Sequence, residues 1–410
     1  MKQFCVAGLL VVLAVAVAAP AGTVHDDLQL VLSTKGPGEF VSALVYLNDA
    51  VDIDALNATL DGQRATLQQR HETVVLALQA RAAATQKPVL ALLEKLQAGG
   101  LVQSYKSFWI ANVISIEATR SAIDQLAAHP SVDVVYLNYP VALDEPVDRR
   151  PAPADEPEAP EPGITAIRAP EVWALGITGA GVRVSTMDTG VDGTHPALAS
   201  RWAGLLPQYA GHPQWAWRDA LGGSPNFPTD GYGHGTHTMG TVCGLAGANQ
   251  IGVAPGAHWI TDNAINQGVG QPLMDDIIAD YQWFADPDGD PNTNWDVPAT
   301  NSNSWGIATS HNFPPWSTPC NSGFWAAIDA LEAVGCVVLY SAGNEGPGAN
   351  TLRRPADRGT DAYRNLAVAA VDANTTGWPI ASFSSRGPTN CGPNGESVTK
   401  PEMSAPGVNV

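Results

Sequence analysis

A segment rich in proline and acidic residues divides this chain. Residues 143–163 read LDEPVDRRPAPADEPEAPEPG, and no apolar periodicity survives in them. Such a segment buries too little apolar surface to offset the entropy of ordering it, and its prolines favour extended conformations. We therefore expect a linker at 143–163 between one domain at 38–142 and another at 164–410. Arg149 and Arg150 offer a cleavage site in this linker, with plain solvation as the alternative.

The first residues have the pattern of a secretory signal. They read MKQFCVAGLLVVLAVAVAAPAG, which places one lysine before an apolar run that small residues close. The apolar run at 4–19 is shorter than the roughly 20 residues of a spanning helix, which disfavours a membrane anchor. We expect a signal peptide at 1–21 and a secreted chain, extracellular or periplasmic, with no membrane partner after cleavage.

Charge and cysteine content narrow the possible partners. The chain has 21 Lys and Arg against 40 Asp and Glu, a net charge of −19. Nucleic acid would be repelled by this field, so we expect no nucleic-acid partner. Once the signal is removed, four cysteines remain, and an oxidising compartment would allow them to pair in three ways that the sequence leaves open. They are Cys243, Cys320, Cys336 and Cys391.

The pattern before the linker predicts a small α/β domain. Its strands are expected at 41–47, 105–110, 113–117 and 132–137, with a long helix at about 51–96 and a shorter one at 121–128. Pro88 should break or kink the long helix. The resulting order is β-α-β-β-α-β, a ferredoxin-like arrangement that contains no cluster of catalytic residue types.

After residue 164, short apolar strands alternate with helical stretches. Strands are expected at 182–187, 253–254 and 337–340, and helices at 275–284 and 323–333. This alternation favours a parallel sheet wrapped by helices. Because chemistry in such sheets takes place at the carboxyl ends of the strands, the residues after each apolar run are the candidates for a site.

An aspartate and two histidines are the first candidates. Asp188 follows a strand in MDTGVDGTHP and could orient a base or simply form a turn. GYGHGTHTMGTVCG at 231–244 places His234 and His237 three apart at a helix start, where both could face a common side. The pair could be a base with a structural partner, two metal ligands or two core histidines. A metal is disfavoured because only Asp188 and His195 could add ligands and no HExxH occurs.

Two asparagine-containing segments add a third constellation. NSNSWG spans 301–306, and SAGNEG at 341–346 follows the apolar run at 337–340. Asn344 could aim its amide at a developing oxyanion, or it could occupy a left-handed turn beside glycine.

Taken together, these motifs resemble the subtilase family of serine peptidases. The resemblance covers about 164–410 and looks most like the bacillopeptidase F-like branch. It rests on Asp188, HGTH at 234–237, NSNSWG, SAGNEG, FSSRGP at 383–388 and KPEMSAPG at 400–407, in that order. It implies a subtilisin-like α/β fold and a serine endopeptidase acting on polypeptide substrates. The 38–142 domain is similar in pattern to the family's inhibitor-type propeptide, a folding chaperone that covers the cleft, so this propeptide is an expected partner.

The resemblance also implies a role for each site residue. His234 would be the general base, Asp188 would orient it and His237 would be structural. Asn344 would supply the oxyanion-hole amide. The residues expected to pair with substrate and to help form the pocket for its P1 side chain are Ser304, Trp305 and Gly306, although Trp305 could be only a packed aromatic.

One element of the family pattern is missing. The family's nucleophile lies in a GTSMAxP motif beyond the SAPG segment, and the 410 residues contain no such motif. Ser404 matches a noncatalytic segment. We therefore expect a truncated or fragmentary chain that is nearly inert and prone to aggregate. The alternative class is a noncatalytic protein that binds peptides or inhibits peptidases.

An acidic loop raises the question of calcium. Asp286, Asp288 and Asp290 alternate around Gly289, a spacing that can bind this ion. No glutamate follows at the EF-hand distance. We expect a solvated acidic turn, with no metal and no cofactor.

Overall fold

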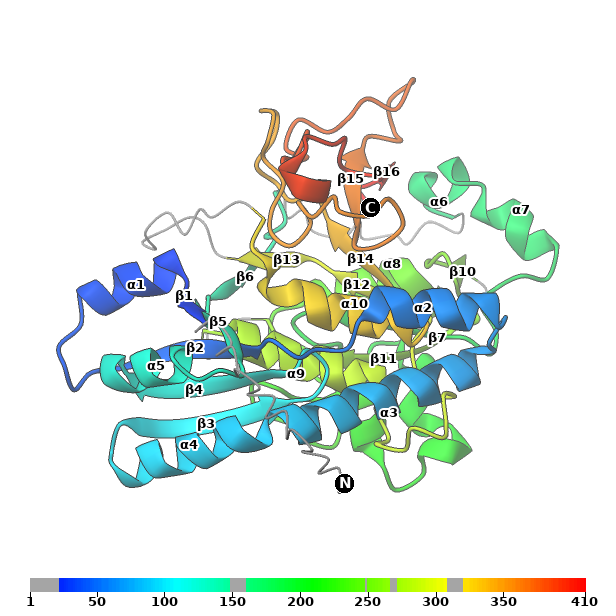
Figure 1. The fold of residues 1–410 in the computed structure, drawn as a ribbon. Coiled ribbons are helices and arrows are strands. Elements are labelled where there is room, and N and C mark those ends of the chain that lie inside the picture. Colours follow the sequence, from blue (N-terminus) through cyan, green and yellow to red (C-terminus); the bar gives the residue numbers. More distant parts are fainter. Residues whose placement is uncertain (1–21, 148–159, 248, 266–270, 308–319) are drawn as a thin grey trace, which may run out of the picture.

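The computed structural model in Figure 1 describes residues 22–147, 160–247, 249–265, 271–307 and 320–410. The expected signal at 1–21, the pair Arg149 and Arg150, and most of the expected linker lie outside these residues. Within the described ranges, no helix combines the length and apolar character that crossing a bilayer requires.

The residues before the acidic segment form a mixed sheet with helices. In the part described, its five strands have the order β1-β5-β2-β4-β3, and every neighbouring pair is antiparallel except β1 with β5. The strands are β1 (Thr23–Val24), β2 (Phe40–Leu47), β3 (Val102–Phe108), β4 (Val113–Thr119) and β5 (Val132–Leu137). The expected β-α-β-β-α-β order runs from β2 to β5 and is confirmed, while β1 and helix α1 (Asp26–Ser33) precede it unexpectedly.

The expected long helix is three helices. They are α2 (Ile53–Gly62), α3 (Leu67–Thr85) and α4 (Lys87–Ala98), and α5 (Arg120–Ala127) follows β4. Pro88 lies in the first turn of α4, where its missing N–H leaves no helical bond unmade, so the predicted break is confirmed. The break before α3 was not predicted. There Thr66 and Gln69 form a capping box, a T-x-x-Q pattern that marks a helix start.

The residues after the acidic segment form a parallel sheet wrapped by helices, as expected. Its seven strands, counted over the described residues, have the order β16-β15-β14-β12-β7-β11-β8, and all neighbours are parallel. They are β7 (Arg183–Met187), β8 (Trp217–Arg218), β11 (His258–Asp262), β12 (Thr300–Asn303), β14 (Val337–Ser341), β15 (Leu366–Val371) and β16 (Met403–Pro406). The helices are α6 (Pro162–Ala166), α7 (Ala169–Ala174), α8 (His234–Cys243), α9 (Met274–Ala285) and α10 (Trp325–Ala333), and β9 (Leu245–Ala246) pairs with β10 (Asn249–Gln250).

The strand expected at 253–254 does not form. The N–H groups of Val253 and Ala254 donate to the carbonyl oxygens of Thr241 and Val242 at 3.0 and 2.8 Å. These carbonyls lie in the last turn of α8 and have no partner within the helix, so the short apolar run satisfies a helix end instead of joining the sheet. The strand in this region is β11, a few residues later.

The part before the acidic segment packs on helices α9 and α10 (Figure 1): strand β3 contacts α9, and helices α2 and α3 contact α10. The Tyr46 hydroxyl donates to the carbonyl oxygen of Gly323 just before α10. At the start of α9, the Asp275 N–H donates to Asn138 Oδ1 at 3.1 Å. The first N–H groups of a helix lack partners within it, so the side chain of Asn138, the residue directly after β5, supplies a partner for one of them in α9.

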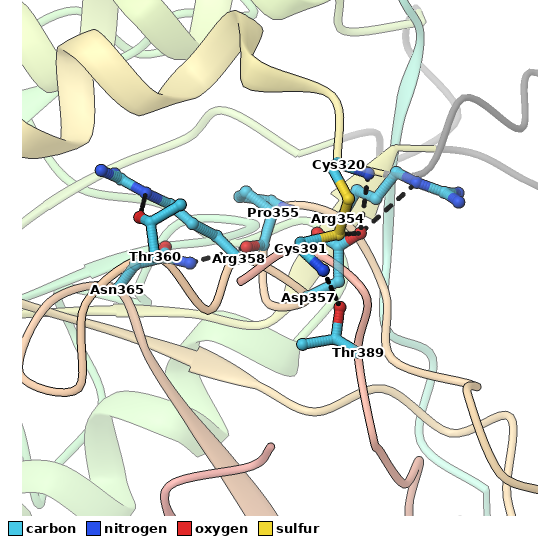
Figure 2. Close-up of a disulfide and its surroundings, with 9 residues drawn as sticks. All are labelled: Cys320, Arg354, Pro355, Asp357, Arg358, Thr360, Asn365, Thr389 and Cys391. Carbon is cyan, nitrogen blue, oxygen red and sulfur yellow. Dashed lines mark hydrogen bonds and ion pairs between the residues drawn. A yellow bond between two sulfur atoms is a disulfide. The ribbon is translucent and has the colours of Figure 1, made fainter. Parts of the chain in front are cut away.

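One disulfide connects two loops among the residues after the acidic segment. Cys320 and Cys391 are bonded across a sequence separation of 71 residues, and Cys243 and Cys336 are buried without a disulfide in the part of the chain described. This is one of the bonds that the sequence allowed. In Figure 2, Asp357 lies beside the disulfide and accepts a hydrogen bond from the Cys320 N–H at 3.4 Å.

Candidate active site

Polar side chains gather at the carboxyl edge of the parallel sheet. Asp188 directly follows β7, Ser304 directly follows β12, and Asn344 lies just beyond β14. These three strands are neighbours in the order β14-β12-β7. The fold therefore brings together residues from three distant parts of the sequence, at the edge where such sheets place their sites.

Asp188 and His234 form a buried pair. His234 opens α8, and its Nδ1 lies 2.7 and 2.9 Å from the two carboxylate oxygens of Asp188. The side chain of Asp188 is 1% exposed and that of His234 is 10% exposed. Because a carboxylate only accepts hydrogen bonds, Nδ1 carries the proton, and the other ring nitrogen, Nε2, is left with a lone pair. This is the tautomer that a general base needs.

Residues that the sequence analysis did not single out hold this pair in place. The Thr189 N–H and the Thr238 hydroxyl donate to the Asp188 carboxylate at 2.7 and 3.2 Å. Asp230 accepts from the Gly233 N–H at 2.7 Å and so fixes the start of α8. Asp230 lies four residues before His234, and an acid just before a helix start is a capping signal that could have identified it.

A glycine allows the helix start to approach Asp188. A Cβ on Gly235 would lie 2.0 Å from the carbonyl oxygen of Gly190, far inside van der Waals contact. Only glycine fits there, which gives the HGTH and DTG motifs a common physical reason: the backbones of their two loops touch. This close contact brings His234 onto Asp188.

The environment of His234 raises the pKa of its imidazole. Burial acts to lower this pKa, but the hydrogen bond to Asp188 and the negative charges of Asp188, Asp144 and Asp230 outweigh burial. The imidazolium that forms when His234 accepts a proton is thus stabilised at this position.

We expect His234 to titrate above the ordinary histidine pKa of about 6.5, and Asp188→Asn to lower that pKa. Because the folded pKa exceeds the unfolded one, the stabilisation from protonated His234 is complete below the unfolded pKa and is lost as the pH rises through the folded pKa. NMR titration of the imidazole protons in both proteins measures this. A pKa of His234 that is the same in both would contradict the assignment of Asp188 as its partner.

The second histidine of the motif has different partners. His237 Nε2 lies 3.0 Å from the carbonyl oxygen of Val410, and His195 Nδ1 accepts from the Ala197 N–H at 3.3 Å.

In the described ranges, no three His, Cys, Asp or Glu side chains group together as a metal site would require. In the acidic loop, the Asp290 N–H donates to Asp288 Oδ1 at 2.8 Å, so that carboxylate binds the loop's own backbone.

The strand expected to bind substrate is paired with the chain itself. β13 (Trp305–Ile307) runs antiparallel to β6 (Val141–Leu143), with Gly306 opposite Ala142, and Figure 1 shows β6 leading from the N-terminal sheet to this edge. The Asp144 N–H donates to the carbonyl oxygen of Ser304 at 2.8 Å. Residues 143–145, expected in the linker, are therefore bound in the structure.

The Trp305 side chain is part of the core. It is 1% exposed, and its ring centroid lies 5.2 Å from that of Phe324 and 5.4 Å from that of Tyr340. The packed-aromatic alternative therefore describes its side chain, while its backbone pairs with Leu143.

Asn344 holds a peptide carbonyl. Its Nδ2 donates to the carbonyl oxygen of Glu145 at 2.8 Å. The left-handed residue of this turn is Gly343, with φ of 101°, and Asn344 is not left-handed. The amide expected to bind an oxyanion thus already binds an uncharged carbonyl from residues that follow β6.

A parallel α/β fold that carries a buried Asp–His pair and an amide donor at its carboxyl edge has the parts of a hydrolase with a histidine base. The model of the Subtilase family matches residues 179–410, and the chain belongs to this family. The resemblance in the sequence motifs is confirmed.

Three curated relatives and one solved structure show how far the similarity extends. Bacillopeptidase F of Bacillus subtilis (strain 168) is 32% identical over 356 residues, which cover 83% of this chain and 23% of that protein. Serine protease AprX of the same strain is 30% identical over 73% of this chain and 60% of its own length. Subtilisin DY of Bacillus licheniformis is 31% identical over 60% of this chain and 72% of its own length.

Fervidolysin from Fervidobacterium pennivorans, described as a keratinolytic enzyme related to subtilisin, shares the fold. Its TM-score is 0.57 at 21% identity, over 90% of this chain and 47% of fervidolysin. The chain thus spans less than two thirds of Bacillopeptidase F, AprX and fervidolysin.

Proposed function

We propose that this chain carries the base, the orienting acid and the oxyanion donor of a serine endopeptidase that hydrolyses polypeptides by a Ser-His-Asp mechanism. The observation that carries the proposal is the buried contact of 2.7 Å between His234 Nδ1 and Asp188, beside an Asn344 amide that binds a peptide carbonyl. Membership of the subtilase family supports it.

Each residue has a defined step in this mechanism. His234 Nε2 takes the proton of the serine hydroxyl as its oxygen attacks the carbonyl carbon, and Asp188 stabilises the resulting imidazolium. The Asn344 amide donates to the oxyanion of the tetrahedral intermediate. His234 then gives the proton to the leaving amine, and water releases the acyl group through the same steps.

We further propose that the nucleophilic serine is not among these 410 residues. No GTSMAxP segment occurs in them. Ser404 lies in β16, opposite Ala369 of β15 in the sheet, and β16 and β7 are separated in the sheet by β15, β14 and β12. A triad needs its serine within hydrogen-bond reach of the base, which the placement of Ser404 in the sheet does not favour.

We propose that the N-terminal unit, at 38–142, acts as an inhibitor-type propeptide, with 143–163 as its linker to the peptidase unit at 164–410. Residues 1–21 are proposed to direct this precursor to the extracellular space or periplasm. The β6–β13 pairing supports this role, because the chain's own segment covers the backbone that a substrate would use. The same pairing favours the second candidate, a noncatalytic protein that binds peptides or inhibits peptidases.

Serine labelling and turnover test the proposal. The 410-residue chain should neither react with a fluorophosphonate probe nor hydrolyse a quenched peptide. Sequencing the coding DNA past the Val410 codon decides whether it reads into GTSMAxP. We call the product of such a reading frame the extended chain, and it should label at that serine and turn over once its N-terminal unit is cleaved.

Two outcomes would contradict the proposal. Labelling or turnover by the 410-residue chain would place the nucleophile within it. An extended chain that stays inactive after removal of the N-terminal unit would favour the binding or inhibiting protein.

A further inference from the structure

Asp144 is held at the end of β6 like the side chain of a bound peptide. Its N–H donates to the carbonyl oxygen of Ser304 at 2.8 Å, which continues the antiparallel pairing of β6 with β13. The next carbonyl along the chain, that of Glu145, accepts from the Asn344 amide. The Asp144 side chain is therefore anchored beside the proposed catalytic groups.

A cation and a hydroxyl surround the Asp144 carboxylate. Arg353 Nη1 lies 2.6 Å from Asp144 Oδ1, and the Ser341 hydroxyl donates to Asp144 Oδ2. The side chains of Asp144 and Arg353 are 3% and 15% exposed. Arg353 Nη1 also donates to the carbonyl oxygen of Leu143 at 3.3 Å, so one guanidinium contacts both the side chain and the backbone of the bound segment.

The strand beneath this pocket leaves room for the arginine. A Cβ on Gly306 would lie 3.0 Å from Cδ and 3.1 Å from Cβ of Arg353, so a larger residue in β13 would crowd the arginine stem. Glu345 binds the other side of the guanidinium, with its Oε1 2.6 Å from Arg353 Nε. Gly306 thus lies against the stem of Arg353 and Glu345 binds its Nε, while its Nη1 binds Asp144.

The charges in the pocket favour an acidic occupant. Burial acts to lower the pKa of Arg353, but Asp144 and Glu345 outweigh burial and keep the guanidinium charged. Burial raises the pKa of the Asp144 carboxyl and the negative charge of Glu345 adds to this rise, which Arg353 and Ser341 reduce but do not cancel. The pocket therefore offsets part of the desolvation of a carboxylate, whereas an amine in the same place would face a buried cation.

We propose that Arg353 and Ser341 form a specificity pocket for an acidic side chain, on the substrate residue whose N–H donates to Ser304, and that Asp144 is the chain's own occupant. This inference rests on the peptidase function proposed above. It assigns peptides with aspartate or glutamate at that position as the preferred substrate class.

Binding of free peptides to an Asp144→Lys chain tests the pocket. Residue 144 should then leave the pocket, because a lysine there would face Arg353. Fluorescence polarisation can compare the binding of labelled six-residue peptides, which have the sequence of residues 139–144 and end in Asp, Asn or Lys. We expect the Asp peptide to bind at least about tenfold more tightly than the Asn peptide, because the Asn peptide lacks the charge-assisted pairing with Arg353. The Lys peptide should bind least tightly, because its amine would face the buried guanidinium. In Asp144→Lys with Arg353→Glu, the order should invert.

Hydrogen exchange of the segment 139–147 shows whether the pocket has opened. Asp144→Lys should lower its protection, while Glu145→Lys, the same change one residue later on an exposed side chain, should leave residues 141–144 protected. Equal affinity for the Asp and Lys peptides would overturn the pocket. So would full protection of the segment in Asp144→Lys.

The failure of the pocket and the failure of the proposed function give different results. If the chain binds all three peptides with equal affinity, only the proposed specificity is overturned, and the proposed peptidase cleft is retained. An opened segment with no binding of any peptide would contradict both the cleft and the pocket.

Discussion

The extended chain should lose about 10⁴-fold in kcat/KM when Asp188 is replaced with asparagine, the scale on which an orienting carboxylate acts in such triads. Asparagine has nearly the same size but presents an N–H₂ group as well as an oxygen. That group can donate to Nδ1 of His234, which forces the proton onto Nε2, the nitrogen that must accept from the serine. Steady-state kinetics on a quenched peptide measure the loss.

Asp192→Asn is the matched control for this change. Asp192 lies four residues along the same loop, and its carboxylate accepts from the Thr194 N–H and hydroxyl at 2.9 and 2.6 Å. Its backbone N–H, which the change leaves in place, donates to the Thr236 hydroxyl at 2.9 Å. We expect kcat/KM to change less than about twofold in this variant, because surface substitutions away from a site have small effects. If Asp188→Asn retained more than a tenth of the wild-type kcat/KM, His234 would not be the base that Asp188 orients.

Local sequence patterns located the pair of Asp188 and His234 because local geometry produces it. Asp188 and His234 each follow or begin a regular element, and their neighbouring glycines are required by a backbone contact between two short loops. Strand ends, helix starts and glycine at close approaches all leave a signature within a few residues. Such features can be predicted from one sequence.

The partners of Asp144 could not be predicted in this way. Its segment contains mostly proline and acidic residues, which indicate a solvated linker, yet the Asp144 side chain is only 3% exposed. Burial there depends on Arg353, more than 200 residues later, and no periodicity near either residue indicates the other. The backbone partners of Val253 could not be predicted either. Its apolar run indicates a strand, but its N–H donates to a carbonyl oxygen at the end of α8.

The disulfide between Cys320 and Cys391 braces the loop that carries the proposed pocket. The Asp357 carboxylate accepts from the Cys320 N–H, and the Asp357 N–H donates to the carbonyl oxygen of Arg353 at 2.8 Å. Figure 2 shows Asp357 directly beside the two sulfur atoms. We therefore expect a change at the disulfide to reach Arg353 through Asp357.

Replacing both Cys320 and Cys391 with alanine should lower the free energy of unfolding of the 410-residue chain by about 4 kcal/mol. A crosslink that closes a loop of 71 residues restricts the unfolded chain, and loop-closure entropy of that length corresponds to roughly this free energy. Urea unfolding followed by tryptophan fluorescence measures it. Wild-type chain treated with a reductant is the matched control, because reduction opens the same loop while both sulfur atoms stay in place.

The reduced wild type and the double alanine variant should agree to within about 1 kcal/mol, the remainder being the small cavities left by the sulfur atoms. The variant should be insensitive to the reductant. Hydrogen exchange of residues 350–358 should also rise in both, since Asp357 would lose the support that fixes Arg353. A reductant that left the wild-type free energy of unfolding unchanged would contradict the crosslink, and a loss of stability without faster exchange at 350–358 would contradict its proposed link to the pocket.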